Sequence, residues 1–138
     1  MSFDDRTIDQ VLAMKTWAIV GLGNNPERAA FGVSKLLQDK GHRIVPVYPR
    51  AETVHSEVGY KSLSEIPFPV DVVDCFVNSK LVGKVVDEAI EIGAKAVWLQ
   101  LDVIDSEAIA RAEAAGLLAI RIAAPLLNIE SEIGRAHV

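Results

Sequence analysis

A glycine-containing stretch, GLGNNPERAAFG at positions 21 to 32, is the first segment whose residue types could bind a ligand. Gly21 and Gly23 follow an apolar run and precede an expected helix. Backbone amides there could approach an anion closely, and the helix would add the positive end of its dipole. Asn25 and Pro26 suit a helix start, but Pro26 stands where a dinucleotide fingerprint has its third glycine. The two glycines therefore do not distinguish a phosphate site from a tight turn without a ligand.

The end of the second expected strand argues against NAD as the ligand. Domains that bind NAD place a carboxylate there, about twenty residues after the glycines, to hold the ribose hydroxyls. This chain has PVYPR at positions 46 to 50 instead. Arg50 would favour a nucleotide with an additional 2′- or 3′-phosphate, although a solvated loop arginine is an equally ordinary role for it.

Cys75 is the only cysteine, which excludes an internal disulfide and a metal site built from several thiolates. The three histidines have no ligand spacing, so no metal is expected. A nucleophilic cysteine needs a base to form its thiolate, and His55, in the loop after the second strand, is the histidine that topology places best. The alternative, which the strand pattern favours, is a buried apolar cysteine on one strand face with Val73 and Val77.

Short apolar strands alternate with amphipathic helices along the chain, and this alternation predicts an α/β fold. An additional helix before the first strand places Ile8, Val11 and Leu12 on one face, where they could cover the sheet. We expect residues 1–138 to form a single domain, with a doubly wound, five-stranded parallel sheet of Rossmann-like topology and strand order 3-2-1-4-5. The expected strands are 17–21, 43–48, 70–77, 96–101 and 117–122.

The helix ends carry their own signals in the sequence. Side chains that can accept hydrogen bonds from free amides precede two of the helices, at Asn78 or Ser79 and at Asp105. Glycines that can end a helix follow three of them, at Gly41, Gly93 and Gly116.

The expected topology places a ligand crevice at the carboxyl ends of the first and fourth strands, where the winding direction reverses. The segments expected to line this crevice follow the strands in turn: Gly21 to Pro26, Tyr48 to Arg50, Asn78 and Ser79, Gln100 to Asp102, and Ile122 to Ala124.

The charge and hydropathy of the chain exclude several classes of partner. The formal net charge is −5, from 14 basic and 19 acidic residues without a basic stripe, which disfavours nucleic acid. Apolar runs fall short of the roughly 20 residues that cross a membrane, and the start MSFDDRTIDQ does not resemble a signal peptide. We expect a cytoplasmic protein with a small-molecule ligand and no membrane or nucleic-acid partner. The sequence leaves open whether the protein forms a homodimer.

Four segments resemble the small stand-alone CoA-binding proteins: NPER after the glycine turn, GHRIVPVYPR, VDVVDCFVNS and AIEIGAKAVWLQL. That family shares the fold of the CoA-binding domain of the succinyl-CoA synthetase α subunit, and the similarity covers nearly the whole chain up to Ile120. The resemblance implies reversible binding of CoA or a related phosphorylated nucleotide, without chemistry of the protein's own. The positions it implies for the phosphates and adenosine are Gly21, Leu22, Gly23, Asn25, Pro26, Arg28, Pro49, Arg50, Asn78 and Ser79.

Departures from the family pattern gather at the carboxyl edge of the sheet. Several of them replace hydroxyl, carboxylate and guanidinium groups by Ala, Gly, Leu or Ile, which predicts a larger, more apolar pocket and a weakened or lost CoA affinity. An engineered or designed descendant of the family is the alternative, acting as a cysteine esterase or hydrolase in which Cys75 attacks and His55 transfers the proton. The departures are Gly21 to Gly23, Ala29 to Phe31, Tyr48, Asp102 and Ile122 to Ala124.

Overall fold

The structure, a computed structural model, describes residues 5–100 and 102–121 of the chain. Two expected parts of the crevice, Leu101 and Ile122 to Ala124, lie outside these residues. Within them, strands and helices alternate as the periodicity predicts. The elements are α1 (Asp5–Leu12), β1 (Thr16–Val20), α2 (Ala29–Asp39), β2 (Arg43–Val47), the 3-10 helix η1 (Leu63–Glu65), β3 (Val72–Cys75), α3 (Ser79–Glu91), β4 (Ala96–Leu99), α4 (Ser106–Ala114) and β5 (Leu118–Arg121).

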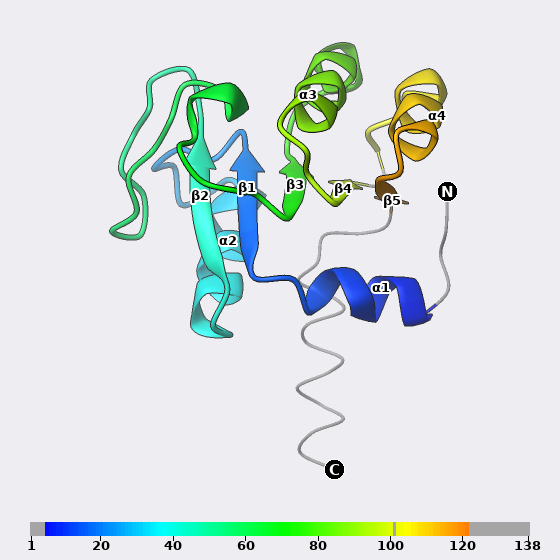
Figure 1. Cartoon of the computed structure of the whole chain (residues 1–138). Coiled ribbons are helices and arrows are strands. Elements are labelled where there is room, and N and C mark those ends of the chain that lie inside the picture. Colours follow the sequence, from blue (N-terminus) through cyan, green and yellow to red (C-terminus); the bar gives the residue numbers. More distant parts are fainter. Residues whose placement is uncertain (1–4, 101, 122–138) are drawn as a thin grey trace.

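The five strands form one parallel sheet in the order β2-β1-β3-β4-β5 (Figure 1). The α/β class and the doubly wound, Rossmann-like sheet are thereby confirmed. The strand order differs from the expected 3-2-1-4-5 in one place, because β3 pairs with β1 and β4 and does not lie outside β2. Both orders bury apolar strands under helices with right-handed crossovers, so hydrophobic patterning does not separate them. The winding direction therefore reverses between β1 and β3.

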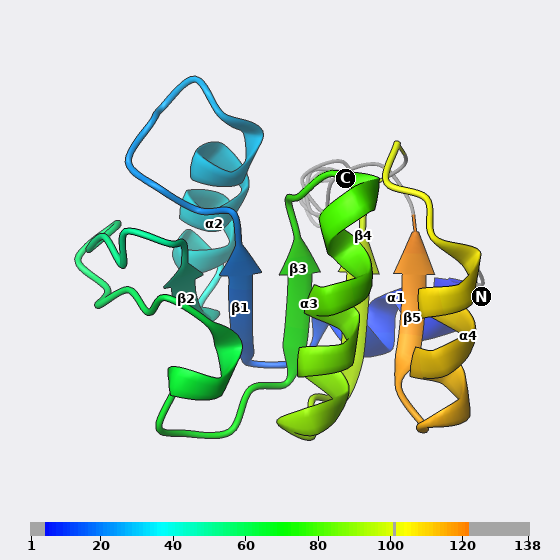
Figure 2. The same cartoon turned by 90° about the horizontal axis from the view of Figure 1, so that it is seen from above.

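Helices cover both faces of the sheet, with α1 and α2 on one side and α3 and α4 on the other (Figures 1 and 2). Strand residues alternate between the two cores. Trp17, Ile19 and Trp98 pack with α1 and α2, whereas Ala18, Val73 and Cys75 pack with α3 and α4. Each strand residue thus faces one side of the sheet. That side determines which side chains can come together at a site near the strand ends.

Most of the expected helix ends are confirmed. The Asn78 side chain accepts hydrogen bonds from the amides of Lys80 and Leu81, and the Asp105 side chain accepts one from Ala108, so both residues cap helices. Gly41, Gly93 and Gly116 all have positive φ after their helices. None of the helices within residues 5–100 and 102–121 has the length and apolar character needed to span a bilayer.

Candidate functional site

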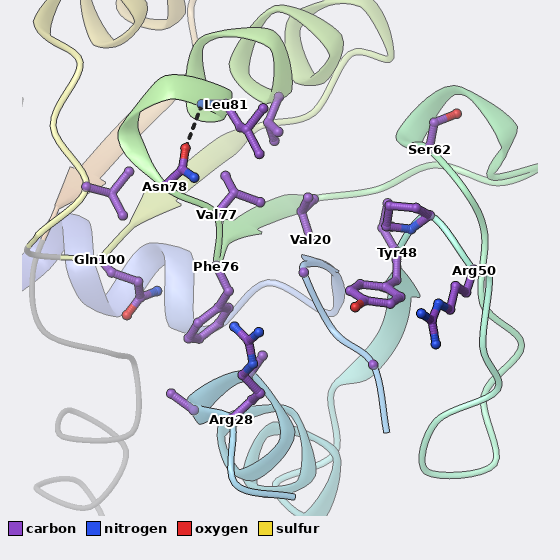
Figure 3. Close-up of a pocket in the computed structure, with 18 of the residues that line it drawn as sticks. Val20, Arg28, Tyr48, Arg50, Ser62, Phe76, Val77, Asn78, Leu81 and Gln100 are labelled. Carbon is purple, nitrogen blue, oxygen red and sulfur yellow. Dashed lines mark hydrogen bonds between the residues drawn. The ribbon is translucent and has the colours of Figure 1, made fainter. Parts of the chain in front are cut away.

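A pocket of about 1210 Å³ opens at the carboxyl ends of β1, β2 and β3 (Figure 3). Its position at the reversal between β1 and β3 is where open α/β sheets place their ligands. Its volume exceeds the roughly 300–1,000 Å³ typical of small-molecule sites, so it can accept an extended nucleotide-sized ligand. Four segments line it: the loop after β1, the loop after β2, the first turns of α3 and the segment after β4.

The glycine turn after β1 lets the backbone pass close to the ends of β2 and β3. Gly21 has φ +100°, its amide donates to the Val47 carbonyl at 2.8 Å, and a Cβ there would collide with the Phe76 carbonyl oxygen. Leu22 is completely buried in the core on the α2 side and does not line the pocket. Gly21 and Gly23 do line it. The turn therefore contributes backbone to the pocket, while its one large side chain contributes to the core.

Asn25 and Pro26 form a turn before α2 and are not its first residues. The Asn25 side chain accepts a hydrogen bond from the Glu27 amide at 3.0 Å, and α2 begins at Ala29 with Arg28 as its N-cap residue. Asn25 and Pro26 suit a helix start in the sequence, but the helix begins three residues later than that placement, within the later start that the sequence also allows. Asn25 and Arg28 line the pocket, whereas Pro26 shapes the turn without lining it.

Basic side chains enter the pocket from three different elements. Arg28 reaches in from the loop before α2, and Arg50 and Tyr48 lie along the loop after β2 (Figure 3). Lys61 and Lys84, which were not predicted from the sequence, also line the pocket. The lining thus holds four basic residues against three acidic ones, Glu52, Glu88 and Asp102, in a chain whose net charge is −5. This local excess of positive charge favours an anionic ligand.

The positions of Lys61 and Lys84 in the sequence could have indicated that they line the pocket. Lys61 belongs to the loop that begins at Tyr48, and Lys84 lies within the first two turns of the helix that Asn78 caps. Both segments leave strands at the crevice, so every basic residue on them was a candidate. Their approach to one pocket depends on β3 lying beside β1, which the expected strand order did not have.

Asn78 and Ser79 line the pocket, but their side chains also hold its wall together. The Asn78 Oδ1 atom accepts from two amides of α3, and the Ser79 hydroxyl accepts from the Ile104 amide at 2.9 Å. Pro49 lines the pocket beside Arg50. The polar groups of this wall are therefore ordered before a ligand arrives.

Cys75 and His55 lie on opposite sides of the sheet. Cys75 is completely buried in the core under α3 and α4, and its burial, with the neighbouring Asp74 carboxyl, raises the pKa of the thiol far above its ordinary value. The Nε2 atom of His55 lies 3.0 Å from the carbonyl oxygen of Phe31 in α2, and the two rings are in contact. Neither residue lines the pocket. The structure does not bring the expected nucleophile and base together, because β3 directs Cys75 away from α2.

Asp74 is a buried acid that was not predicted as a site residue. It is completely buried, and burial raises the pKa of its carboxyl well above the ordinary value despite a hydrogen bond from Gln100, which lowers it. Gln100 lines the pocket. Among the described residues, the second carboxyl oxygen of Asp74 and the indole nitrogen of Trp98 have no hydrogen-bond partner. The position of Asp74 within an otherwise apolar strand could have indicated a buried acid with a special role.

No metal site is evident in the part of the chain that the structure describes. Residues 5–100 and 102–121 contain no group of three or more histidine, cysteine, aspartate or glutamate side chains arranged to hold a metal ion.

Comparison with known sequences identifies a family. Residues 15–129 match the profile of a family described as a CoA binding domain. The uncharacterized protein YneT of Bacillus subtilis is 36% identical over 94 residues, which cover 68% of this chain and 70% of that protein. The α subunit of an ADP-forming acetate–CoA ligase II of Pyrococcus furiosus is 36% identical over 81 residues, 58% of this chain. This chain spans only 18% of that subunit.

Solved structures agree with this result. A hypothetical protein from Pyrococcus horikoshii OT3 is 36% identical with a TM-score of 0.89, over 94% of this chain and 92% of the other. A protein redesigned for binding is 34% identical with a TM-score of 0.91, over 96% and 94% of the two chains. The family profile spans most of the sequence, including all five strands. The protein therefore belongs to the CoA-binding domain family.

Proposed function

We propose that the protein binds CoA, or a closely related phosphorylated adenine nucleotide, reversibly in the pocket at the ends of β1, β2 and β3. The observation that carries this proposal is the convergence of four basic side chains on one pocket of an acidic chain. CoA combines a pyrophosphate, a 3′-phosphate and a long uncharged arm. A site for it needs basic groups in more than one place together with an apolar surface, and the lining offers both.

The phosphates have donors on two sides of the pocket. Arg28 serves the pyrophosphate, because it lines the pocket from the loop between β1 and α2. Arg50 lies on the neighbouring loop and serves a further phosphate on the ribose. Charge-assisted hydrogen bonds of this kind typically contribute about 1.5–3 kcal/mol each to the binding free energy. Two or three of them would therefore decide which phosphorylated nucleotide the pocket prefers.

The uncharged parts of the ligand have an apolar wall. Val20, Val47, Phe76, Val77 and Leu81 line the pocket between the strand ends and α3. Leu81 is 50% exposed, so covering it with a ligand would remove apolar surface from water. Phe76 and Tyr48 are aromatic residues against which an adenine ring could stack.

The proposal is tested by isothermal titration of the full chain with CoA, dephospho-CoA and NAD. We expect CoA to bind most tightly, dephospho-CoA more weakly because it lacks the 3′-phosphate, and NAD weakest because the end of β2 lacks the ribose carboxylate. Equal affinity for CoA and NAD, or no heat with any of the three at millimolar concentration, would contradict the proposal.

Two expectations from the sequence stay predictions. They are a CoA affinity weakened by the departures from the family pattern and an engineered origin of the pocket. The same titration measures the first of them. No contact in the pocket favours the cysteine esterase over CoA binding, since Cys75 and His55 lie outside it.

A further inference from the structure

Two hydrogen bonds tie the loop after β1 to the loop after β2, directly over the glycine turn. The backbone amide of Asn24 donates to the Oε1 atom of Glu52 at 2.9 Å, and the Asn24 side-chain amide donates to the Thr53 carbonyl at 2.9 Å. Gly23 lies against the same carboxylate, because a Cβ at Gly23 would stand only 2.9 Å from Glu52 Oε1. A carboxylate of the chain itself therefore occupies the surface of the turn.

This is the surface on which a phosphate oxygen would be bound. Free backbone amides of a glycine turn are the donors that such loops offer to anions. Here the Asn24 amide already has an anionic acceptor, and Glu52, Asn24 and Gly23 all line the pocket. The carboxylate thus stands in the position of a ligand's anionic group.

The charge of Glu52 is not neutralised by a close ion pair. Within residues 5–100 and 102–121, no lysine or arginine nitrogen lies within 4.0 Å of its carboxylate, although four basic residues line the same pocket. The hydrogen bond that it receives comes from a neutral backbone amide. A phosphate brought to the turn would meet a negative charge that no lysine or arginine of the described residues neutralises at ion-pair distance.

We propose that Glu52 is a specificity-determining residue that competes with the ligand's phosphate for the Asn24 amide. A ligand with a phosphate at the glycine turn binds only when it displaces the carboxylate or approaches against its repulsion. A ligand without charge at that point is unaffected. The inference rests on the proposed function. It adds that the site discriminates between ligands with and without a negative charge at the glycine turn, which the basic residues alone would not do.

A different role for Glu52 makes the opposite prediction. A carboxylate soon after β2 could accept hydrogen bonds from ribose hydroxyls, as in NAD-binding domains. In that case its replacement would weaken nucleotide binding. The hydrogen bond to Asn24 favours competition, since it directs the carboxylate to the anion donors of the turn.

The decisive variant is Glu52→Gln, with Glu57→Gln as its matched control. The glutamine side chain in the first variant retains an oxygen that can accept from the Asn24 amide, so the tie between the loops persists while the charge is lost. Glu57 lies in the same loop but does not line the pocket, so its replacement makes the same change in net charge elsewhere. Both variants and the wild-type chain are titrated with CoA, ADP and adenosine.

We expect Glu52→Gln to bind CoA and ADP about 10-fold more tightly than wild type, with adenosine and Glu57→Gln unchanged. Unchanged or weaker binding of CoA and ADP by Glu52→Gln, with a binding wild type, would overturn the competition and leave the proposed function standing. Binding of CoA or ADP by Glu52→Gln but not by wild type would support the competition at the Asn24 amide and would contradict CoA binding by the wild-type chain. Absence of binding by both proteins would overturn the proposed function and this inference together.

A second measurement follows the Asn24 amide itself. In ¹⁵N-labelled protein, the Asn24 amide resonance should shift during titration with inorganic pyrophosphate at lower concentration in Glu52→Gln than in wild type. Shifts at equal concentrations in the two proteins would reject competition at this amide.

Discussion

The side-chain amide of Gln100 donates a hydrogen bond of 3.0 Å to the carboxyl group of Asp74, so a residue that lines the pocket is held by an acid buried completely beneath it. This relationship joins the pocket wall to the core of the sheet. It also places an ionisable group where its charged form is costly.

The Asp74→Asn variant should change how stability depends on pH. Because burial raises the pKa of Asp74 above its ordinary value of 3.8, the folded state binds the proton more tightly than the unfolded state. That contribution is complete below the ordinary pKa and is lost as pH rises towards the raised one. Between the two values, wild type should lose up to about 1.4 kcal/mol per pH unit relative to Asp74→Asn.

Urea denaturation of both proteins at several pH values between 4 and 8 measures this difference. The asparagine side chain of the variant keeps an oxygen for the Gln100 hydrogen bond, and any cost of its new amide is the same at every pH. Parallel stability curves for the two proteins would show that Asp74 is ionised in the folded state.

Cys75 should behave as an inert core residue. Burial raises the pKa of its thiol, so we expect a thiol reagent to react with it only after unfolding in urea. Hydrolysis of an aryl ester should be equal in wild type, Cys75→Ala and His55→Ala. A burst of product that is lost in Cys75→Ala and reduced in His55→Ala would restore the esterase hypothesis.

Gly21→Ala should strongly destabilise the fold. An alanine at φ +100° is strained, and its Cβ would collide with the backbone of Phe76, so we expect a loss of more than about 2 kcal/mol in the free energy of unfolding. Gly32→Ala is the control, since Gly32 lies inside α2 with nothing within 4 Å of its added Cβ. That change should stabilise by about 0.5–1 kcal/mol. Equal effects of the two substitutions on urea denaturation would refute the packing argument.

The basic residues of the pocket should differ in the phosphate that they serve. Arg50→Ala should weaken CoA binding about 10-fold while leaving dephospho-CoA nearly unchanged, whereas Arg28→Ala should weaken both. Lys35→Ala is the control, because Lys35 pairs with Asp39 on the surface of α2 and does not line the pocket. Loss of both ligands in Arg50→Ala would assign Arg50 to the pyrophosphate instead.

Local features of the fold were predictable because they depend on neighbours in the sequence. The alternation of strands and helices, the caps at Asn78 and Asp105 and the glycines that end helices are set by backbone sterics and short-range hydrogen bonds. The loop after β1 was predictable in the same way, and Gly21, Asn25, Arg28 and Arg50, which the family resemblance implied, do line the pocket.

Contacts between distant segments were not predictable from such signals. Hydrophobic patterning is satisfied by either strand order, so the place of β3 beside β1 follows only from the hydrogen-bonded sheet. Glu52 meets Asn24 across 28 positions of the chain, and Lys61 and Lys84 reach the pocket from different elements. No spacing rule joins residues that far apart.

The sequence by itself determined the α/β class, the glycine turn after the first strand and the family, because these depend on composition, periodicity and contiguous motifs. The tertiary structure decided which side of the sheet each strand residue faces and which loops close over the turn. It separated Cys75 from His55 and placed the Glu52 carboxylate on the turn's amide, since both outcomes depend on how strands pair and helices cover them.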